Sequence, residues 1–253
     1  MSIHPGNTGF IATRTVKNVL LAACFAVLTS VAHADLAPGF DAAMSAADRP
    51  AEDKQRDASR KPAEVLEFLG IGEGMRVLDA LAGGGWYSEV LAAAVGPEGK
   101  VIAQNTLRGK QRSGATIEAR AARLKNIEPL FEDFDDLSVG PPVDAALTAL
   151  NLHDMHNHGA ETGQVFLRAI FDALKPGGVF GVIDHVGVGD QDNLALHRIE
   201  LPVAIDAIEQ AGFIVEETAD ILSNPADDHT LNIHDEALGR NTDRFVIRAR
   251  KPQ

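Results

Sequence analysis

The stretch Val77-Leu78-Asp79-Ala80-Leu81-Ala82-Gly83-Gly84-Gly85-Trp86-Tyr87 decides the fold expected for this chain of 253 residues. A short apolar strand closes on an acidic residue, three glycines follow, and a helix begins at two aromatic residues. Such a turn lets the backbone approach a ligand closely, while the helix N-terminus offers free N–H groups. The alternative is a tight strand-to-helix turn that needs glycine dihedrals and binds nothing.

Strands and helices alternate on both sides of this turn. The alternation predicts a mostly parallel sheet covered by helices on both faces, with an antiparallel strand at the end. Strands are expected at 75–80, 100–103, 127–131, 143–150, 179–183, 213–216 and 244–248, and helices at 63–69, 86–95, 113–125, 165–174 and 201–211. Residues 62–253 are therefore expected to form one domain, and the polar residues 35–61 an N-terminal arm with a solvated helix.

The first 34 residues have the layout of a cleavable signal peptide. Arg14 and Lys17 precede an uncharged run at 19–31, and the small residues of Ala32-His33-Ala34 follow it. A membrane anchor needs about 18 to 20 apolar residues, which is longer than this run. A lipoprotein signal ending at Cys24 leaves too few apolar residues before the cysteine. We expect cleavage near Ala34 and a periplasmic or secreted protein without stable membrane insertion.

The net charge and the cysteine content limit the kinds of partner and of reactive group that the chain can have. The formal net charge is −13, and the single cysteine lies within the expected signal peptide. The mature chain therefore has neither a disulfide nor a thiolate nucleophile. An acidic chain without a Lys/Arg patch argues against nucleic acid and favours a small-molecule substrate. The oligomeric state is not indicated.

The glycine turn resembles motif I of the class I S-adenosylmethionine-dependent methyltransferases. This resemblance implies a Rossmann-like fold with a seven-stranded sheet, with Asp79, Gly83, Gly84 and Gly85 at the cofactor. More narrowly, the chain is similar to a family of predicted bacterial methyltransferases with exported members. The segments that carry this closer resemblance are Gly83-Gly84-Gly85-Trp86-Tyr87-Ser88-Glu89, Asn151-Leu152-His153-Asp154-Met155, Ile183-Asp184-His185, His197-Arg198-Ile199, Asn224-Pro225-Ala226-Asp227-Asp228-His229-Thr230 and Thr242-Asp243-Arg244-Phe245.

Two positions depart from the methyltransferase pattern. Leu81 stands where a first glycine is expected. Gln104 and Asn105 stand where an acidic residue usually accepts the ribose hydroxyls, and an amide accepts a hydrogen bond without supplying charge. Asp133 lies where such proteins often contact the adenine amino group, although it also belongs to an exposed acidic turn.

A polar segment follows the apolar strand at 143–150. Asn151, His153 and Asp154 come where open α/β sheets place their ligands, and Asp184-His185 ends the next strand in the same way. A histidine can take a proton near neutral pH, and a neighbouring carboxylate fixes its tautomer. We expect His153 with Asp154 to be the base, Asn151 to face the cofactor, and Asp184 and His185 to join the catalytic group. The alternative is that one of these residues only caps a helix.

Further polar residues follow later in the chain. The segments 190–198 and 224–235 are expected to fold over the rim of the sheet as lids and to bring His197, His229 and His234 to the catalytic group. Arg244 either pairs with Asp228 or Asp243 and positions His229, or belongs to a turn held by side chains. Imidazole and carboxylate groups suit zinc, iron or manganese, but the spacing matches no recognised metal motif, so no metal is assigned.

Two classes of function remain. The first is an S-adenosylmethionine-dependent methyltransferase that acts on an unidentified small molecule. The second is an exported binding protein, or a metal-assisted enzyme, that keeps the fold but has lost the cofactor. Fold alone does not decide between them.

Overall fold

The computed structural model describes residues 1–3 and 34–253, and the expected signal peptide lies almost wholly outside these residues. Its centre is a seven-stranded sheet in the order β3-β2-β1-β4-β5-β7-β6. Strands β1 to β5 run parallel to one another, whereas β7 is antiparallel to both β5 and β6. The strands are β1 Arg76–Ala80, β2 Lys100–Asn105, β3 Ile127–Phe131, β4 Val143–Ala149, β5 Leu174–His185, β6 Ile214–Ala219 and β7 Arg244–Arg250. The predicted α/β architecture is confirmed.

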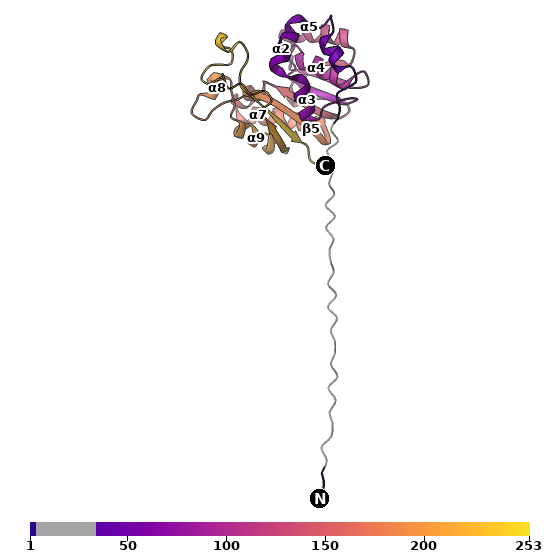
Figure 1. Ribbon diagram of the computed structural model, residues 1–253, viewed down its shortest axis with the longest axis vertical. Coiled ribbons are helices and arrows are strands. Elements are labelled where there is room, and N and C mark those ends of the chain that lie inside the picture. Colours follow the sequence, from indigo (N-terminus) through magenta and orange to yellow (C-terminus); the bar gives the residue numbers. More distant parts are fainter. Residues whose placement is uncertain (4–33) are drawn as a thin grey trace. The chain divides into compact units, whose positions relative to one another are not determined.

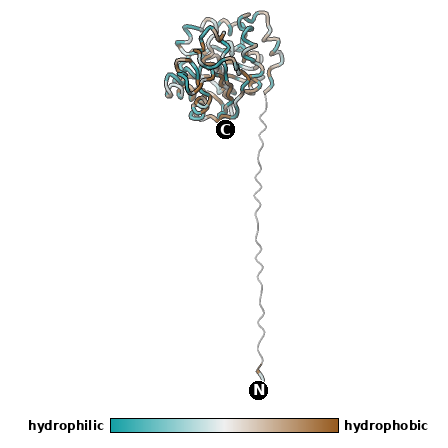
Figure 2. Tube along the Cα trace, turned by 60° about the vertical axis from the view of Figure 1, so that its left-hand side comes forward, coloured by the Kyte–Doolittle hydropathy of each residue, from teal (hydrophilic) through white to brown (hydrophobic). Residues whose placement is uncertain are grey.

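Helices cover both faces of the sheet (Figure 1). Alternate residues of each strand face opposite layers, so that Leu78 packs with Phe166 on one face and Val77 packs with Leu66 on the other. Hydrophobic segments run through the interior of the domain (Figure 2). One face carries α3 Pro62–Leu69, α4 Trp86–Val95 and α5 Leu107–Leu124, and the other carries α6 Leu152–Asn157, α7 Ala160–Ala173 and α9 Leu201–Gln210.

Element boundaries differ from the expected ones in several places, most of all at the starts of α5, α7 and β5. Helix α5 begins at Leu107, six residues before the predicted start, because Thr106 caps it by accepting the N–H of Gly109 at 3.0 Å. Strand β5 begins at Leu174, five residues before its expected start at 179, next to a register shift against β4.

The N-terminal arm, residues 35–61, differs from the solvated helix that the sequence predicts. It holds two short helices, α1 Phe40–Ser45 and α2 Ala51–Arg60, and two of its charged residues are buried. Asp53 accepts a hydrogen bond from Arg120 of α5 at 2.8 Å, and its carbonyl accepts the indole N–H of Trp86 at 3.0 Å. Arg49 pairs with Asp57. The polar arm therefore docks on α4 and α5 through buried ion pairs.

No helix among residues 1–3 and 34–253 combines the length and the apolar content that a membrane crossing needs.

Candidate functional site

The glycine turn after β1 contains three residues with left-handed backbone. Leu81, Gly83 and Gly85 have φ of 58°, 56° and 81°. A side chain at Gly85 would place its Cβ 2.2 Å from Cδ1 of Ile117, so glycine is required there by packing. At Gly83 a Cβ would meet nothing within 4 Å. The open side of the turn is therefore at Gly83, whereas Leu81 adopts a conformation that costs about 1–2 kcal/mol for a residue other than glycine.

The two amides at the end of β2 hold this turn. The Gly83 N–H donates to Oδ1 of Asn105 at 2.9 Å, and Nδ2 of Asn105 donates to the Gly83 carbonyl at 3.0 Å. Oε1 of Gln104 accepts the Leu81 N–H at 3.0 Å and so fixes the strained residue. A carboxylate at position 105 could accept the first bond but could not donate the second. An amide replaces the usual acidic residue here because the side chain clamps the turn.

Asp79 ends β1 beneath the turn and is 2% exposed. Ser88 Oγ donates to its carboxylate at 2.6 Å. Burial raises the pKa of Asp79 to about 7, although the Ser88 hydrogen bonds and the charge of Arg120 lower it. The group can therefore exchange a proton near neutral pH.

A pocket of about 350 Å³ opens beside Asp79 and the turn, between the ends of β1 and β4 and helix α2. The buried Tyr87 lines it, and its hydroxyl has no hydrogen-bond partner among the described residues. Arg60 stacks over Trp86 with its guanidinium 4.6 Å from the ring centre. The lining thus combines the cationic Arg60 with the carboxylate of Asp79 and the open face of Gly83.

The predicted cofactor residues divide into two groups. Asp79, Gly83, Gly84 and Asn151 line the pocket. The predicted residues outside its lining are Gly85, Asn105 and Asp133.

Asn151 and Asp133 have different environments. Nδ2 of Asn151 donates to the Ala149 carbonyl at 2.9 Å and lies 3.4 Å from the Leu81 carbonyl, which links the end of β4 to the turn. The exposed Asp133 accepts the Leu107 N–H at 3.2 Å, at the start of α5.

His153 and Asp184 lie in direct contact, as the sequence predicts. Nδ1 of His153 lies 2.6 Å from Oδ1 of Asp184, and the other oxygen of Asp184 accepts the His153 N–H at 2.8 Å. The two residues are 1% and 0% exposed. The imidazole is therefore held in one orientation by a buried carboxylate.

His153 and Asp184 shift each other's pKa in opposite directions, which makes the imidazole a stronger base. Burial lowers the pKa of His153, but the carboxylate of Asp184 outweighs burial and raises it above its ordinary value. Burial likewise opposes charge on Asp184, and the contact with His153 holds its pKa below the usual range. His185, whose Nδ1 lies 2.6 Å from the Thr242 hydroxyl, is different: burial lowers its pKa to about 3. It is neutral at physiological pH.

Asp154 contacts two histidines, His153 and His197, and His197 comes from the expected lid segment 190–198. Oδ1 of Asp154 lies 3.3 Å from Nε2 of His153 and 2.8 Å from Nδ1 of His197. The His197 ring is in turn 5.3 Å from that of His234, centre to centre. Four histidines and two carboxylates thus form the histidine cluster, which consists of His153, Asp154, Asp184, His185, His197 and His234.

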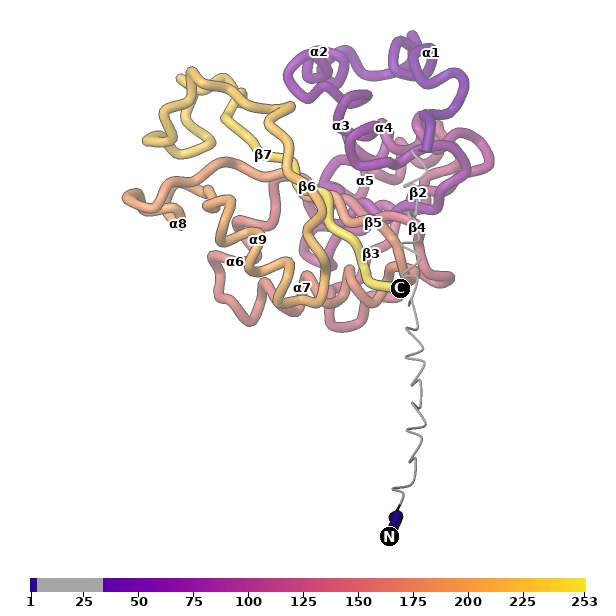
Figure 3. Tube along the Cα trace, turned by 60° about the horizontal axis from the view of Figure 1, so that its bottom comes forward, coloured from indigo at the N-terminus to yellow at the C-terminus, as the bar shows by residue number. Residues whose placement is uncertain are grey.

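The two expected lid segments do contact one another, next to α8 Asn193–Leu196 (Figure 3). Nδ2 of Asn232 donates to the Ala195 carbonyl at 2.7 Å. Arg198, fully buried, donates to both oxygens of Asp227 at 2.9 and 3.0 Å and to the Leu231 carbonyl. No local pattern along the chain indicates this pair, because an arginine in a polar loop is usually solvated.

His229 belongs to a separate network. Its Nε2 lies 2.9 Å from Asp243. Arg244 donates to the Ser59 carbonyl at 2.9 Å and to the Thr242 carbonyl at 3.2 Å, and among the described residues it forms no ion pair with Asp228 or Asp243, so the structure favours the alternative of a turn held by side chains. The buried ion pair of this region is between Arg198 and Asp227.

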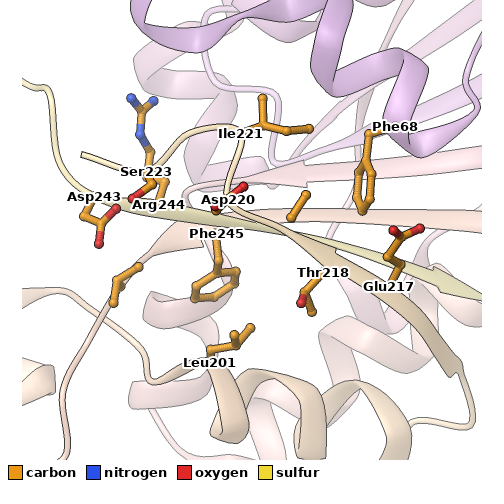
Figure 4. Close-up of a pocket in the computed structure, with 12 residues that line it drawn as sticks. Phe68, Leu201, Glu217, Thr218, Asp220, Ile221, Ser223, Asp243, Arg244 and Phe245 are labelled. Carbon is orange, nitrogen blue, oxygen red and sulfur yellow. The ribbon is translucent and has the colours of Figure 1, made fainter. Parts of the chain in front are cut away.

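A larger cavity, of about 570 Å³, lies at the edge formed by β6 and β7 (Figure 4). Phe68, Leu201 and Phe245 contribute its apolar walls, and Glu217 and Asp220 its carboxylates. Its lining contains neither the glycine turn nor a member of the histidine cluster. We therefore place the chemistry in the pocket beside Asp79 and in the histidine cluster.

Comparisons with known proteins agree with this architecture. Residues 8–132 match the family model of protein-L-isoaspartate(D-aspartate) O-methyltransferase. A search of curated proteins found no match. The matched segment contains the glycine turn and both amides of β2, and it ends before the histidine cluster.

Solved structures show the same fold. An S-adenosylmethionine-dependent methyltransferase from Aquifex aeolicus is 21% identical with a TM-score of 0.60, over 79% of this chain and 94% of that one. The [4+2]-cyclase SpnF is 19% identical with a TM-score of 0.61, over 88% and 87%. Aeropyrum pernix fibrillarin, solved with natively bound S-adenosyl-L-methionine, is 17% identical with a TM-score of 0.53, over 76% of each chain. The chain thus has the class I methyltransferase fold. The family match and this fold support a methyltransferase with S-adenosylmethionine as its cofactor.

Proposed function

We propose that this protein transfers the methyl group of S-adenosylmethionine to a small molecule bound at the histidine cluster. The observation that carries the proposal is the adjacency of the two sites. Strands β1, β4 and β5 are neighbours, and Asn151, which lines the pocket beside Asp79, is two residues from His153. A methyl donor in the pocket and an acceptor at the cluster can therefore meet.

The residues around the turn suit the cofactor. Asp79, the open face of Gly83, the Tyr87 hydroxyl and the Arg60 guanidinium would hold its charged groups. When bound, S-adenosylmethionine supplies a methyl group on a sulfonium sulfur. Fibrillarin binds the same molecule on this fold, and the family match covers the segment with the turn.

The remaining chemistry belongs to the chain. Holding a nucleophile in line with the methyl carbon supplies much of the acceleration of methyl transfer, because well-oriented reactants react far faster than free ones. The acceptor must also lose its proton. The histidine cluster is the group suited to this step, because Asp184 fixes the ring of His153 and Asp154 lies at the opposite nitrogen.

The acceptor is proposed as a small molecule because the cluster is only partly open. His153 and Asp184 are buried, whereas the side chains of Asp154 and His197 are 47% and 37% exposed. A small hydroxyl, amine or thiol compound can reach the exposed pair. The cyclase SpnF has this fold with a different chemistry, so the fold alone does not carry the activity.

A transfer assay tests the proposal. The protein is incubated with S-adenosylmethionine carrying a labelled methyl group and with pools of small alcohols, amines and thiols. We expect label in at least one pool, and its loss in Asp184→Asn. Label that transfers equally well in Asp184→Asn would refute the role of the cluster.

We also propose that the protein is exported and that its mature chain begins at Asp35. The support is the charge pattern of Arg14 and Lys17, the apolar run and the small residues before Asp35. Mass spectrometry of protein from the native envelope tests it. A chain that begins at an acylated Cys24, or one that keeps Met1, would overturn it.

A further inference from the structure

Three atoms of the histidine cluster lie as ligands of one ion would lie. Oδ1 of Asp154 is 3.3 Å from Nε2 of His153 and 2.8 Å from Nδ1 of His197, and the three groups offer atoms within 4.8 Å of one another. Zinc binds imidazole nitrogen and carboxylate oxygen at about 2.0–2.1 Å in tetrahedral sites, which spaces ligand atoms about 3.3 Å apart. The observed separations are close to this value.

The carboxylate behind His153 strengthens the case. Asp184 holds Nδ1 of His153 at 2.6 Å, so Nε2 points away from it toward Asp154. Histidines that bind metals usually donate their other ring N–H to a carboxylate, which orients the ring and raises its basicity. The oxygens of Asp184 also accept the backbone N–H groups of His153 and His185, each at 2.8 Å. The carboxylate is thus a fixed outer partner.

His197, the third of these groups, has a strained backbone conformation. His197 has a φ of 55°, which is unfavourable for a residue with a side chain. The fully buried Arg198 that follows it is fixed by the bidentate contact with Asp227. Strained residues that the surrounding structure holds in place often belong to functional sites. In this conformation, at the end of α8, Nδ1 of the His197 ring lies 2.8 Å from Asp154.

We propose that His153, Asp154 and His197 bind a zinc-like divalent cation whose remaining coordination position faces the acceptor. Two imidazoles and one carboxylate with an open position are a ligand set of catalytic zinc sites. The partial exposure of Asp154 and His197 leaves that position accessible. Its role rests on the proposed methyltransferase function: a cation lowers the pKa of a bound hydroxyl or thiol, whose proton passes to solvent before the methyl group is transferred. The sequence spacing hides this set, because 43 residues separate Asp154 from His197.

Zinc binding by the full chain tests the site directly. Purified protein is analysed for metal, stripped with a chelator and titrated with zinc chloride in a calorimeter. We expect one zinc per chain, and losses of affinity of about 100-fold or more in His197→Ala and Asp154→Ala. Asp184→Asn should lose about 10- to 100-fold, the range for outer partners of metal ligands.

His158→Ala is the matched control, since His158 is exposed at the end of the same helix and contacts only the Asp154 carbonyl through its ring. It should bind zinc as the parent does. Circular dichroism confirms that each variant is folded. Failure of the parent to bind zinc stoichiometrically, or parental affinity in His197→Ala, would overturn the site.

Calorimetry with S-adenosylmethionine separates this inference from the proposed function. Binding of the cofactor without zinc binding overturns the metal site and leaves the methyltransferase proposal standing. Zinc binding that needs His197, in a protein that does not bind the cofactor, supports the metal site and overturns the methyltransferase proposal.

Discussion

Replacing Asn105 with Asp separates two explanations for the amide at the end of β2. If Asn105 is a weak substitute for an acidic ribose acceptor, a carboxylate should tighten binding of S-adenosylmethionine. The structure predicts the opposite, because Nδ2 of Asn105 donates to the Gly83 carbonyl at 3.0 Å and the residue is 3% exposed. Asn105→Asp leaves that carbonyl without its donor and sets a buried carboxylate against it.

The expected loss of unfolding free energy follows from the loss of the hydrogen bond between Asn105 and the Gly83 carbonyl. A buried polar group left without its partner costs about 1–3 kcal/mol. For a domain of this size each kcal/mol lowers Tm by roughly 2–4 °C, so a fall of about 2–12 °C is expected. Thermal unfolding followed by circular dichroism measures it, and calorimetry with S-adenosylmethionine should show weaker binding because the turn is no longer clamped.

Asn126→Asp is the control. Nδ2 of Asn126 donates to the carbonyls of Ala92 and Gly96, each at 2.9 Å, so this variant also loses amide donors but does not contact the glycine turn. Its Tm should fall while its cofactor affinity stays at the parental level. Tighter cofactor binding in Asn105→Asp, or an unchanged Tm, would refute the clamp.

Three further predictions concern the site. Gly83→Val should abolish cofactor binding and lose stability only through its left-handed φ of 56°, whereas Gly85→Val should unfold at a still lower temperature, because it combines a φ of 81° with a Cβ 2.2 Å from Cδ1 of Ile117; equal thermal shifts would contradict this. His153→Ala and His185→Ala should each lower methyl transfer by about 10²-fold, and the double variant by much less than the product; full activity in both would exclude the pair. Burial raises the pKa of Asp79 to about 7 from an ordinary 3.8, so its contribution to stability is present below about pH 4 and is lost as pH rises to about 7. Relative to Asp79→Asn, the parent should lose on the order of 4 kcal/mol of unfolding free energy over that range in urea titrations; a constant difference would falsify the shift.

The order of the elements was predictable because it depends on local patterns. Apolar runs, the Gly83–Gly85 turn and the terminal polar residues of each strand are all visible along the chain. The rule that parallel strands end at one edge was enough to bring His153 and Asp184 together.

The contacts between distant segments were not predictable in this way. Arg198 and Asp227 form a fully buried pair, and Asp53 binds Arg120 across two helices. Each of these residues appears in a polar stretch that sequence alone reads as solvated, because nothing local marks the partner. The contacts of Asn105 were hidden for a similar reason: the pattern of its strand showed the amide but not the Gly83 backbone that it binds.

Titration of the protein with S-adenosylmethionine in a calorimeter tests the central claim most directly. The account predicts saturable binding of one molecule per chain to the parent and its loss in folded Gly83→Val. A folded parent that releases no binding heat and shows no thermal shift with millimolar S-adenosylmethionine would contradict it.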